Sequence, residues 1–462
     1  MRRIRFEALF ALCACLCLSS QAFAATTINS LPFTCSKAGE RYVLGQNLTI
    51  KSGTGITINA NDVTIDGNNK TITHSVSGAG TAININAKSN VEIHDVTITQ
   101  SSYTGTGYVY GIKGSGSNLN IRDSIINVKA RKSDKQTYGI KVDVSNHGDI
   151  QYCTFNLSGV NRFYGFKGSG PWDVHHNTVK VSNHTYPNAG SYPHVFYLSG
   201  NNQEYYNNDI DVGSDSFAVN LFAAWGPFNN NKIYDNSIRF ASDHGRLFLM
   251  DSDTDNWLIY GNNITVTSNN TGSNSVSVFR IRTSDPGNPA STGHIIHSNI
   301  VDASAANKTT VLSIGDQAPA SSGVRFYNND VKSASDVITI YTSNVSDLDV
   351  YSNTIEYTGG GWNGVPVRFN GSSMKDIVFS NNDISGNQAE GDLVQVSSNV
   401  SSQVTFCKSA SVDSAADIRG GGMVKIITSG TCQDDYTGDP PDGTSPPVVA
   451  TDPPAIISIT VN

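Results

Sequence analysis

The chain of 462 residues lacks the sequence features of several large protein classes. No segment after residue 24 shows sustained helical periodicity, which argues against a helical bundle. No apolar run after residue 24 is long enough to cross a membrane as a helix. We therefore expect neither a helical domain nor a transmembrane segment.

Basic residues are too few for a nucleic-acid-binding protein. The sequence has 31 Lys and Arg against 39 Asp and Glu, a net charge of -8. Removal of residues 1–24, with three Arg and one Glu, leaves 28 basic and 38 acidic residues and a net charge of -10. Nucleic acid is bound through excess positive charge, so we expect no nucleic-acid partner and only a local basic site.

Cysteine is also scarce. Of seven cysteines, three lie within the first 24 residues, which leaves Cys35, Cys153, Cys407 and Cys432. No C-x-x-C or Cys/His spacing indicates a zinc site. We expect a disulfide between Cys407 and Cys432, at the end of the repeats, in an oxidising compartment. Cys153 is expected to be a small buried side chain, and the pairing of Cys35 stays open.

The N-terminus has the pattern of an export signal. "MRRIR" is basic, "FEALFALCACLCL" is largely apolar, and Ala22-Phe23-Ala24 fits an A-x-A cleavage site. The sequence therefore predicts a signal peptide over residues 1–24 and a mature protein that is secreted, either periplasmic or extracellular.

What the chain does contain is a repeat, seen in "HHNTV" (175–179), "YNNDI" (206–210), "YDNSI" (234–238), "YSNTI" (351–355) and "SNNDI" (380–384). The Asn of each Asn-x-(Ile/Val) unit recurs mostly every 24 to 31 residues, with a degenerate unit "HSNI" at 297–300. Such a period, with several short strands in each unit, predicts an all-β parallel solenoid of about a dozen coils. We place it at residues 25–433, terminal caps included.

Stacking of the coils explains the recurrent Asn. Coils lie roughly 4.8 Å apart, so Asn residues at one position can exchange amide hydrogen bonds along the rod. Asn also tolerates the left-handed backbone of a tight corner. We expect these Asn residues to be structural, with the following Ile or Val in the core. A Pro-rich tail follows over residues 434–462, and its closing "AIISITVN" is expected to be a strand without partners.

The opening "INSLPFTCSKAGERYVLGQNLTIKSGTGITINANDVTIDGNNKTIT" resembles the first coils of secreted proteins of the pectin-lyase-like superfamily. The repeat units resemble its short repeat motif, and the resemblance covers residues 28 to 430. It implies a right-handed parallel β-helix. Many members act on polysaccharides as lyases, hydrolases, esterases or epimerases, whereas others only bind or serve as surface structures. The polygalacturonase and alginate epimerase signatures are missing, so no catalytic residue can be carried over.

Three similar strands, "YGIKG", "YGIKV" and "YGFKG", predict Lys113, Lys141 and Lys167 in one register, alternating with inward Ile112, Ile140 and Phe166. Stacked lysines repel one another unless an anion balances them. We therefore expect a polyanion to bind there, together with Arg246. The alternative is a solvated lysine edge that prevents aggregation.

The central coils carry the candidate catalytic residues. We expect Lys167, His194 or Tyr197 to act as a base. Arg280 and Arg282 are expected to project from the strand face and neutralise a substrate carboxylate. The insertions at 183–193, 285–293 and 316–323 would form the walls of the groove.

Aspartates offer two further interpretations. Alignment of "LFLMDSD" with "FRIRTSD" places Asp253 and Asp285 at one height, where close like charges raise a pKa or bind a cation. A hydrolase would pair Asp251 or Asp253 with Asp285 as acid and base. Asp251, Asp253 and Asp255 could also bind Ca²⁺, or they could form a turn that only caps its own backbone.

The favoured function is a lyase that cleaves an acidic, uronate-containing polysaccharide by β-elimination. The first alternative is a non-catalytic carbohydrate-binding or surface protein. The second is a glycoside hydrolase that uses paired aspartates.

Overall fold

The computed structural model describes residues 25–460 with internal gaps. The gaps are 76–77, 101–106, 131–135, 161, 185–191, 215, 217, 269–274, 283–288, 316–320, 342–344, 360–364, 372–373, 387–392, 398–403, 408–417, 421–422 and 430–454. The predicted signal peptide, Cys432, Asp285 and most of the three insertions lie outside the described residues. Expectations about them stay predictions.

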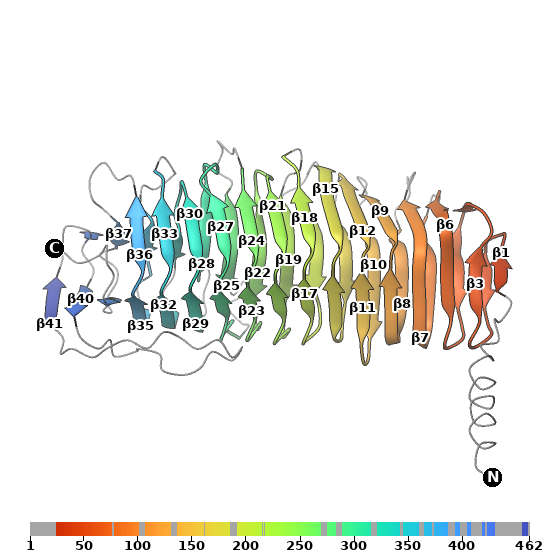
Figure 1. Ribbon diagram of the computed structural model, residues 1–462, viewed down its shortest axis with the longest axis horizontal. Helices are drawn as coiled ribbons and strands as arrows, with labels where there is room; N and C mark the ends of the chain where they lie inside the picture. The colour runs from red at the N-terminus through yellow and green to blue at the C-terminus, as the bar shows by residue number, and fades with distance from the viewer. Residues whose placement is uncertain are drawn as a thin grey trace, which may run out of the picture.

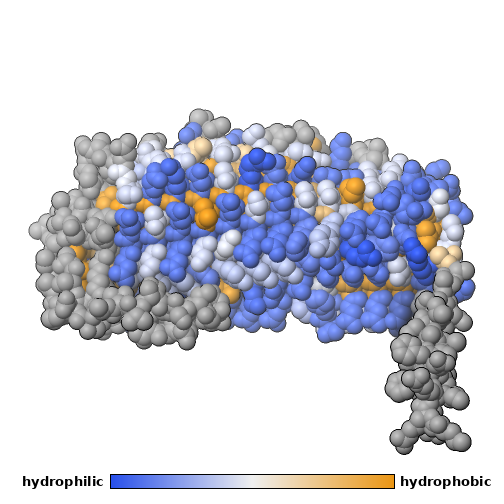
Figure 2. All heavy atoms as spheres, viewed as in Figure 1, coloured by the Kyte–Doolittle hydropathy of each residue, from blue (hydrophilic) through white to orange (hydrophobic). Residues whose placement is uncertain are grey.

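The protein is a straight rod of stacked β-strands (Figure 1). The described residues form 41 strands, and successive coils of the rod pair in parallel. The described residues contain no helix, and hence none that is long and apolar enough to span a membrane. The expected all-β parallel β-helix is confirmed. Its outer surface is mainly hydrophilic on the side seen in Figure 2.

Each coil contributes a strand to each of three faces. The first face contains β2 (Phe33–Cys35), β5 (Gly53–Ile58), β8 (Val109–Arg122), β10 (Thr137–Val144), β13 (Phe163–Gly168), β16 (His194–Leu198), β19 (Val219–Trp225), β22 (Gly245–Asp251), β25 (Val276–Arg282), β28 (Thr309–Ile314), β31 (Ile338–Ile340), β34 (Val367–Phe369), β37 (Val394–Val396) and β39 (Ile418–Gly420).

The second face contains β1 (Thr26–Ile28), β3 (Arg41–Leu44), β6 (Thr64–His74), β11 (Gly148–Gln151), β14 (Trp172–His175), β17 (Glu204–Tyr206), β20 (Lys232–Tyr234), β23 (Leu258–Tyr260), β26 (Ile295–His297), β29 (Ser321–Tyr327), β32 (Val345–Tyr351), β35 (Met374–Ser380), β38 (Val404–Cys407) and β40 (Met423–Ser429). The long strand β7 (Gly80–Gln100) bends around the corners and pairs on all three faces.

The third face contains β4 (Leu48–Ile50), β9 (Ile125–Ala130), β12 (Thr154–Gly159), β15 (Thr178–His184), β18 (Asp209–Val212), β21 (Ser237–Phe240), β24 (Asn263–Val266), β27 (Ile300–Ala303), β30 (Asp330–Ser333), β33 (Thr354–Tyr357) and β36 (Asp383–Gly386). At the C-terminal end, β41 (Ala455–Thr460) pairs antiparallel with β40. The expectation of a closing strand without partners was therefore wrong.

The core is built from aligned apolar rows. Phe196, Phe222, Phe248 and Phe279 are fully buried on successive coils, and their ring centroids lie 5.0–5.3 Å apart. Period-two alternation turns these side chains inward and their neighbours outward. Burial at this scale is the main source of stability in such a rod.

The asparagine ladder is confirmed at the corner between the second and third faces. Seven Nδ2–Oδ1 hydrogen bonds of 2.9–3.0 Å join eight buried residues, Asn177, Asn208, Asn236, Asn262, Asn299, Asn329, Asn353 and Asn382. Each Oδ1 also accepts from a backbone N–H on the preceding coil, as Asn236 does from Asn208. The ladder therefore satisfies backbone groups that would otherwise be buried without partners.

The left-handed backbone was assigned to the wrong residue. Positive φ occurs one residue before each ladder Asn, at His176 (54°), Asn207 (53°) and Asp235 (53°), among others. The ladder Asn itself does not adopt it. The preceding residue makes the turn, and this frees the Asn side chain to point into the corner.

The cysteines agree with the expectations where they are described. Cys153 is buried, takes the ladder position on its coil, and donates its backbone N–H to Asn177 Oδ1 at 2.9 Å. Burial raises the pKa of its thiol to about 12, which suits a structural residue. Cys35 and Cys153 are free thiols. Cys407 is disulfide-bonded, and its expected pairing with Cys432 stays a prediction.

Candidate functional site

The lysine row on the first face is confirmed. Lys113 pairs in register with Lys141, and Lys141 with Lys167, on β8, β10 and β13. The inward neighbours Ile112, Ile140 and Phe166 are fully buried, as expected. The three ammonium groups therefore leave the rod on the same face, one coil apart.

A row of aromatic rings lies beside the lysines. The rings of Tyr110, Tyr138, Tyr164 and His194 stack along the first face, with centroids 4.8–5.1 Å apart. Each lysine nitrogen stands 4.8–5.3 Å from the ring centroid on its own strand, and Lys167 Nζ is also 4.3 Å from the centroid of Tyr197. Cation–π attraction thus holds the ammonium groups in place.

Glycine makes this arrangement possible, because the Tyr-Gly-x-Lys pattern places a glycine between the two rows. A Cβ at Gly139 would lie 2.6 Å from the carbonyl oxygen of Gly165, and a Cβ at Gly165 would lie 2.7 Å from that of Val195. A side chain there would force the coils apart. The glycines let neighbouring coils approach, so that the tyrosine rings, of which Tyr138 and Tyr164 are buried, stack beside the lysine row.

The lysine row is not neutralised by ion pairs. Within the described part of the chain, no carboxylate lies within ion-pair distance of Lys113, Lys141 or Lys167. Elsewhere, cations pair with acids on neighbouring coils, as in Lys232–Glu204 (2.8 Å) and Arg239–Asp211 (3.1 Å). The first face therefore carries stacked like charge, whereas much of the remaining surface carries compensated charge.

Lys167 differs from an exposed lysine. Burial, followed by the charge of Lys141, lowers the pKa of its ammonium group, and the carboxylate of Asp143 opposes this shift. A lowered pKa increases the share of neutral amine at a given pH. Lys167 is thus the best candidate for a base on this face.

His194 and Tyr197 lie beside Lys167, so the structure brings the three base candidates together. Tyr197 is the register partner of Lys167, and its ring stacks with Trp225 at 5.6 Å. Burial raises the pKa of Tyr197 to about 12, which keeps its hydroxyl protonated. His194 is only 2% exposed, and burial lowers its pKa well below the ordinary value. His194 is therefore better explained as a neutral residue that packs against the neighbouring rings than as a base that contacts substrate.

The arginines lie apart from these candidates. Arg280 and Arg282 are on β25, three coils from β16, a separation on the order of 14 Å. Phe279 and Ile281 point inward as expected, but Arg282 is not a solvated charge. Its side chain is 12% exposed, and its Nε and a terminal nitrogen each lie 2.9 Å from Asp251 Oδ2.

The expected alignment of "LFLMDSD" on β22 with "FRIRTSD" on β25 was wrong by one residue. The structure pairs Phe248 with Phe279 and Asp251 with Arg282, because the two phenylalanines stack in the core. The shift replaces the expected pair of aspartates with an aspartate–arginine ion pair. Asp285 lies outside the described residues, so its part in an acid–base pair stays a prediction.

The aspartates proposed for calcium already have hydrogen-bond partners. Asp251 accepts from Arg282 and from Ser252 Oγ at 3.0 Å. Asp255 Oδ1 accepts from the backbone N–H of Thr292 at 2.9 Å and from its hydroxyl at 2.6 Å. Asp253 is half-buried in a left-handed backbone conformation (φ 61°). Calcium binding here stays a prediction, and the contacts of Asp255 resemble those of a structural turn.

Arg246 belongs to the aromatic row. It pairs in register with Asn220, which pairs with His194. Its guanidinium lies 4.7 Å from the ring centroid of Tyr192, whose hydroxyl is 2.9 Å from His244 Nε2. Arg246 therefore lies two coils from His194 on the first face, but it is only 8% exposed. Its role in substrate binding stays a prediction.

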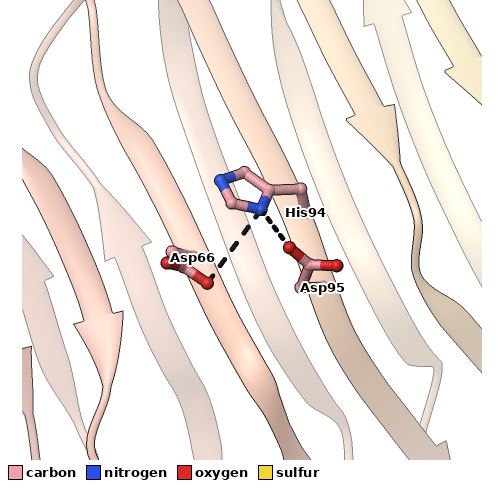
Figure 3. A group of neighbouring side chains, drawn as sticks. All are labelled: Asp66, His94 and Asp95. Carbon is pink, nitrogen blue, oxygen red and sulfur yellow. Dashed lines mark hydrogen bonds and ion pairs between the residues drawn. The ribbon is translucent and has the colours of Figure 1, made fainter.

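A different group of side chains near the N-terminal end has the composition of a metal site (Figure 3). His94 Nδ1 lies 2.8 Å from Asp95 Oδ2 and 4.0 Å from Asp66 Oδ1. However, the guanidinium of Arg41 binds the other oxygen of Asp66. A fixed positive charge at that position disfavours a cation, so the group is better explained as an ion-pair network.

Two further features of the surface were missed in the sequence. On the second face, seven rings stack with centroids 4.7–5.1 Å apart, namely His175, Tyr206, Tyr234, Tyr260, His297, Tyr327 and Tyr351. The available signal was the Tyr or His found two residues before seven of the eight ladder Asn residues. On the third face, a shallow groove of about 500 Å³ lies over β15, β18, β21 and β24.

No protein-family profile matches the chain, and no curated protein matches it in sequence. Among solved structures it is similar to a double mutant of the tailspike protein of E. coli bacteriophage HK620, with 12% identity and a TM-score of 0.38 over 91% of this chain and 77% of that chain. It is also similar to tailspike protein 3 of bacteriophage CBA120, with 10% identity and a TM-score of 0.23 over 87% of this chain and 56% of that chain. Similarities this distant identify no function, so the functional argument depends on the side chains of the first face.

Proposed function

We propose that the protein binds an acidic polysaccharide along the first face, over β8, β10, β13 and β16. The observation that carries the proposal is the row Lys113, Lys141 and Lys167, stacked one coil apart without an ion-pair partner in the described residues. Like charges at this spacing repel one another. A polyanion with regularly spaced carboxylates would relieve that repulsion by charge-assisted hydrogen bonds.

The aromatic side chains favour a sugar polymer as the partner. Tyr108 is exposed, and Tyr197 and Trp225 are half-buried next to the lysines. Their rings offer rigid apolar faces with polar edges, which suit the mixed apolar and hydroxylated surface of a sugar. The net charge of -8 disfavours nucleic acid. An extended polymer lying along the rod would contact several coils at once.

A second candidate is a lyase that cleaves the bound polymer, and the environment of Lys167 favours it. Its pKa is lowered, and Tyr197, with a pKa of about 12, lies at cation–π distance. Neutral Lys167 would take the proton at C5 of a uronate. The C–H electron pair would form the C4–C5 double bond, the C4–O bond would break, and the Tyr197 hydroxyl would protonate the leaving oxygen.

We also propose that the protein is exported and belongs with the secreted β-helix proteins of the pectin-lyase-like superfamily. The signal-like residues 1–24 and the opening coils support this assignment. N-terminal sequencing of the protein from the cell exterior or periplasm would test the export step. A chain that retains Met1 in the cytoplasm would contradict it.

The binding proposal is tested with the triple variant Lys113→Gln, Lys141→Gln, Lys167→Gln. We expect its affinity for pectate or alginate to fall at least about tenfold, since one charge-assisted contact contributes roughly 1.5 kcal/mol or more. Added salt should weaken wild-type binding more than variant binding. A matched control replaces Lys232 and Lys332 with Gln, because both are ion-paired. Equal losses in both variants would contradict a specific role for the row.

The lyase candidate is tested separately with Lys167→Arg. Arginine keeps the positive charge but stays protonated, so it cannot serve as a base. We expect the variant to bind the polymer while losing the ultraviolet absorbance of unsaturated products. If wild-type protein binds the polymer and forms neither unsaturated products nor new reducing ends, the protein is a binder only. New reducing ends without that absorbance would indicate a hydrolase instead.

A further inference from the structure

The repeat unit "HHNTV" differs from the others because two histidines precede its ladder Asn. His175 ends β14, and His176 follows in the left-handed conformation (φ 54°). Consecutive residues of a strand point to opposite faces, but this corner turns the second side chain beside the first. The two Nδ1 atoms lie 2.7 Å apart. Two imidazole nitrogens therefore converge at one point on the edge of the rod.

Asp149 determines which atom of His175 is available. Its Oδ1 lies 3.2 Å from His175 Nε2, on the coil below. Among the described residues, this buried oxygen has no hydrogen-bond partner, and a carboxylate only accepts. A proton on His175 Nε2 would satisfy it and would leave a lone pair on Nδ1. Metal-bound histidines in proteins commonly have such a carboxylate on the other ring nitrogen. The orientation thus matches that of a metal ligand.

The surroundings carry negative charge. Asp149 and Asp173 face each other in register on β11 and β14, and the carboxylates of both act on His175. Glu204 follows on β17 but is ion-paired with Lys232 at 2.8 Å. In the group at His94, by contrast, Arg41 already binds Asp66. A cation at His175 and His176 would meet a favourable field.

The site is open to solvent. His176 is exposed and His175 is half-buried. The ring of Tyr152, which is 55% exposed, lies 5.3 Å from that of His176 and forms one wall. The stacked ring of Tyr206, 4.7 Å from that of His175, forms the opposite wall. An ion could therefore enter without any movement of the backbone, and water would fill its remaining coordination positions.

We propose that His175 and His176 bind a divalent transition metal ion, Zn²⁺ or Cu²⁺, through their Nδ1 atoms, with Asp149 as the positioning residue. Two imidazoles suit these borderline ions and not Ca²⁺ or Mg²⁺, which prefer oxygen ligands. His176 would move its proton from Nδ1 to Nε2, so binding to the neutral rings requires no net loss of protons. The site is independent of the proposed polysaccharide face, because it lies on another edge of the rod.

The neighbouring coil provides a variant that should fold. Tyr206 and Asn207 occupy the positions of His175 and His176 one coil later, with the same left-handed backbone at Asn207. The double variant His175→Tyr, His176→Asn should therefore keep the melting temperature of the wild type. A matched control is His147→Gln, which removes another half-exposed histidine of the same region.

The test is calorimetric titration of the untagged mature protein with ZnCl₂, and Cu²⁺ electron paramagnetic resonance as a second readout. We expect one zinc equivalent in the wild type and in His147→Gln, and nitrogen hyperfine structure from two imidazoles in the copper spectrum. The double variant should lose this equivalent, and Asp149→Asn should weaken binding by about 10- to 100-fold. A wild type without zinc binding, or a double variant that binds as the wild type does, would overturn the proposal. Unchanged affinity in Asp149→Asn would overturn the role of Asp149.

Discussion

Arg282 and Asp251 form a buried ion pair between two coils of the first face, with two nitrogens of Arg282 each 2.9 Å from Asp251 Oδ2. The Asp251 side chain is fully buried. This contact changes the role expected for Arg282, from a ligand of substrate carboxylates to a partner of a carboxylate within the protein. The consequence can be measured as stability.

Arg282→Gln should lower the free energy of unfolding by roughly 3 kcal/mol, because it removes a charged partner of a buried carboxylate. Urea denaturation would measure this loss. Arg239→Gln is the control, since the Arg239–Asp211 pair is exposed and exposed ion pairs contribute little to stability. Adding Asp251→Asn to Arg282→Gln should recover part of the loss. Similar small effects in both single variants would show that Arg282 is free to bind a ligand.

Asn236→Leu should destabilise the rod by a few kcal/mol. Asn236 is 1% exposed, and its Nδ2 donates to Tyr205 O, Tyr234 O and Asn262 Oδ1. Leucine would remove these donations and also the Oδ1 that accepts from the backbone N–H and Nδ2 of Asn208. Each buried polar group left unsatisfied costs about 1–3 kcal/mol. Thermal unfolding followed by circular dichroism would record the loss. The control is Asn207→Asp at the neighbouring corner position, where Asp235 is tolerated one coil later. An unchanged melting temperature in Asn236→Leu would mean that the ladder does not stabilise the rod.

Acid should destabilise the protein through buried neutral histidines. Burial lowers the pKa of His294 to about 3 and that of His74 to about 4, whereas both bind a proton near pH 6.5 when unfolded. The unfolded state therefore binds more protons between pH 6.5 and 4, and the free energy of unfolding falls by about 1.4 kcal/mol per pH unit for each histidine.

The raised pKa values of Asp149 and Asp173 act in the opposite direction, so the pH dependence of wild-type stability does not isolate the effect of His294. The difference in the free energy of unfolding between wild type and His294→Gln isolates it. Urea denaturation at pH 7, 6, 5 and 4 should give a shallower pH dependence for the variant. Parallel curves would contradict a neutral His294 in the folded protein.

Removal of residues 455–462 should promote self-association. β41 pairs with the last parallel strand of the second face, and an uncovered strand edge is a template for pairing with another chain. We expect multi-angle light scattering to detect larger species in the truncated protein at concentrations where the full chain stays monodisperse or keeps a fixed oligomeric state. Identical profiles would show that β41 does not protect this edge.

The fold could be predicted because its repeat is local. A ladder Asn and the apolar residue two positions later occupy the same place in each coil, so Asn208 and Ile210 already describe Asn236 and Ile238. The lysine row could be predicted for the same reason, since Tyr-Gly-x-Lys recurs at Lys113, Lys141 and Lys167. Both the fold and the lysine row could therefore be predicted from the periodicity of the sequence.

The register of β22 against β25 could not be found this way. The two sequences align almost equally well with a shift of one residue, and the choice depends on the stacking of Phe248 on Phe279 in the core. This shift of one residue determines whether Asp251 lies opposite Arg282. The contact between His175 and Asp149 was missed because it joins different positions of two successive coils. Asp149 is in register with Asp173 and not with His175, so alignment of equivalent repeat positions does not reveal the contact.

The asparagine ladder has a direction. In every link from Asn177 to Asn382, the Nδ2 of one residue donates to the Oδ1 of the next residue toward the C-terminus. If a single amide turned over, it would place two oxygens face to face on one side and two N–H groups on the other. The eight amides must therefore share one orientation, so the dipoles of the row add instead of cancelling. The corner therefore carries a net dipole along the rod, and its direction is the same at all eight Asn residues.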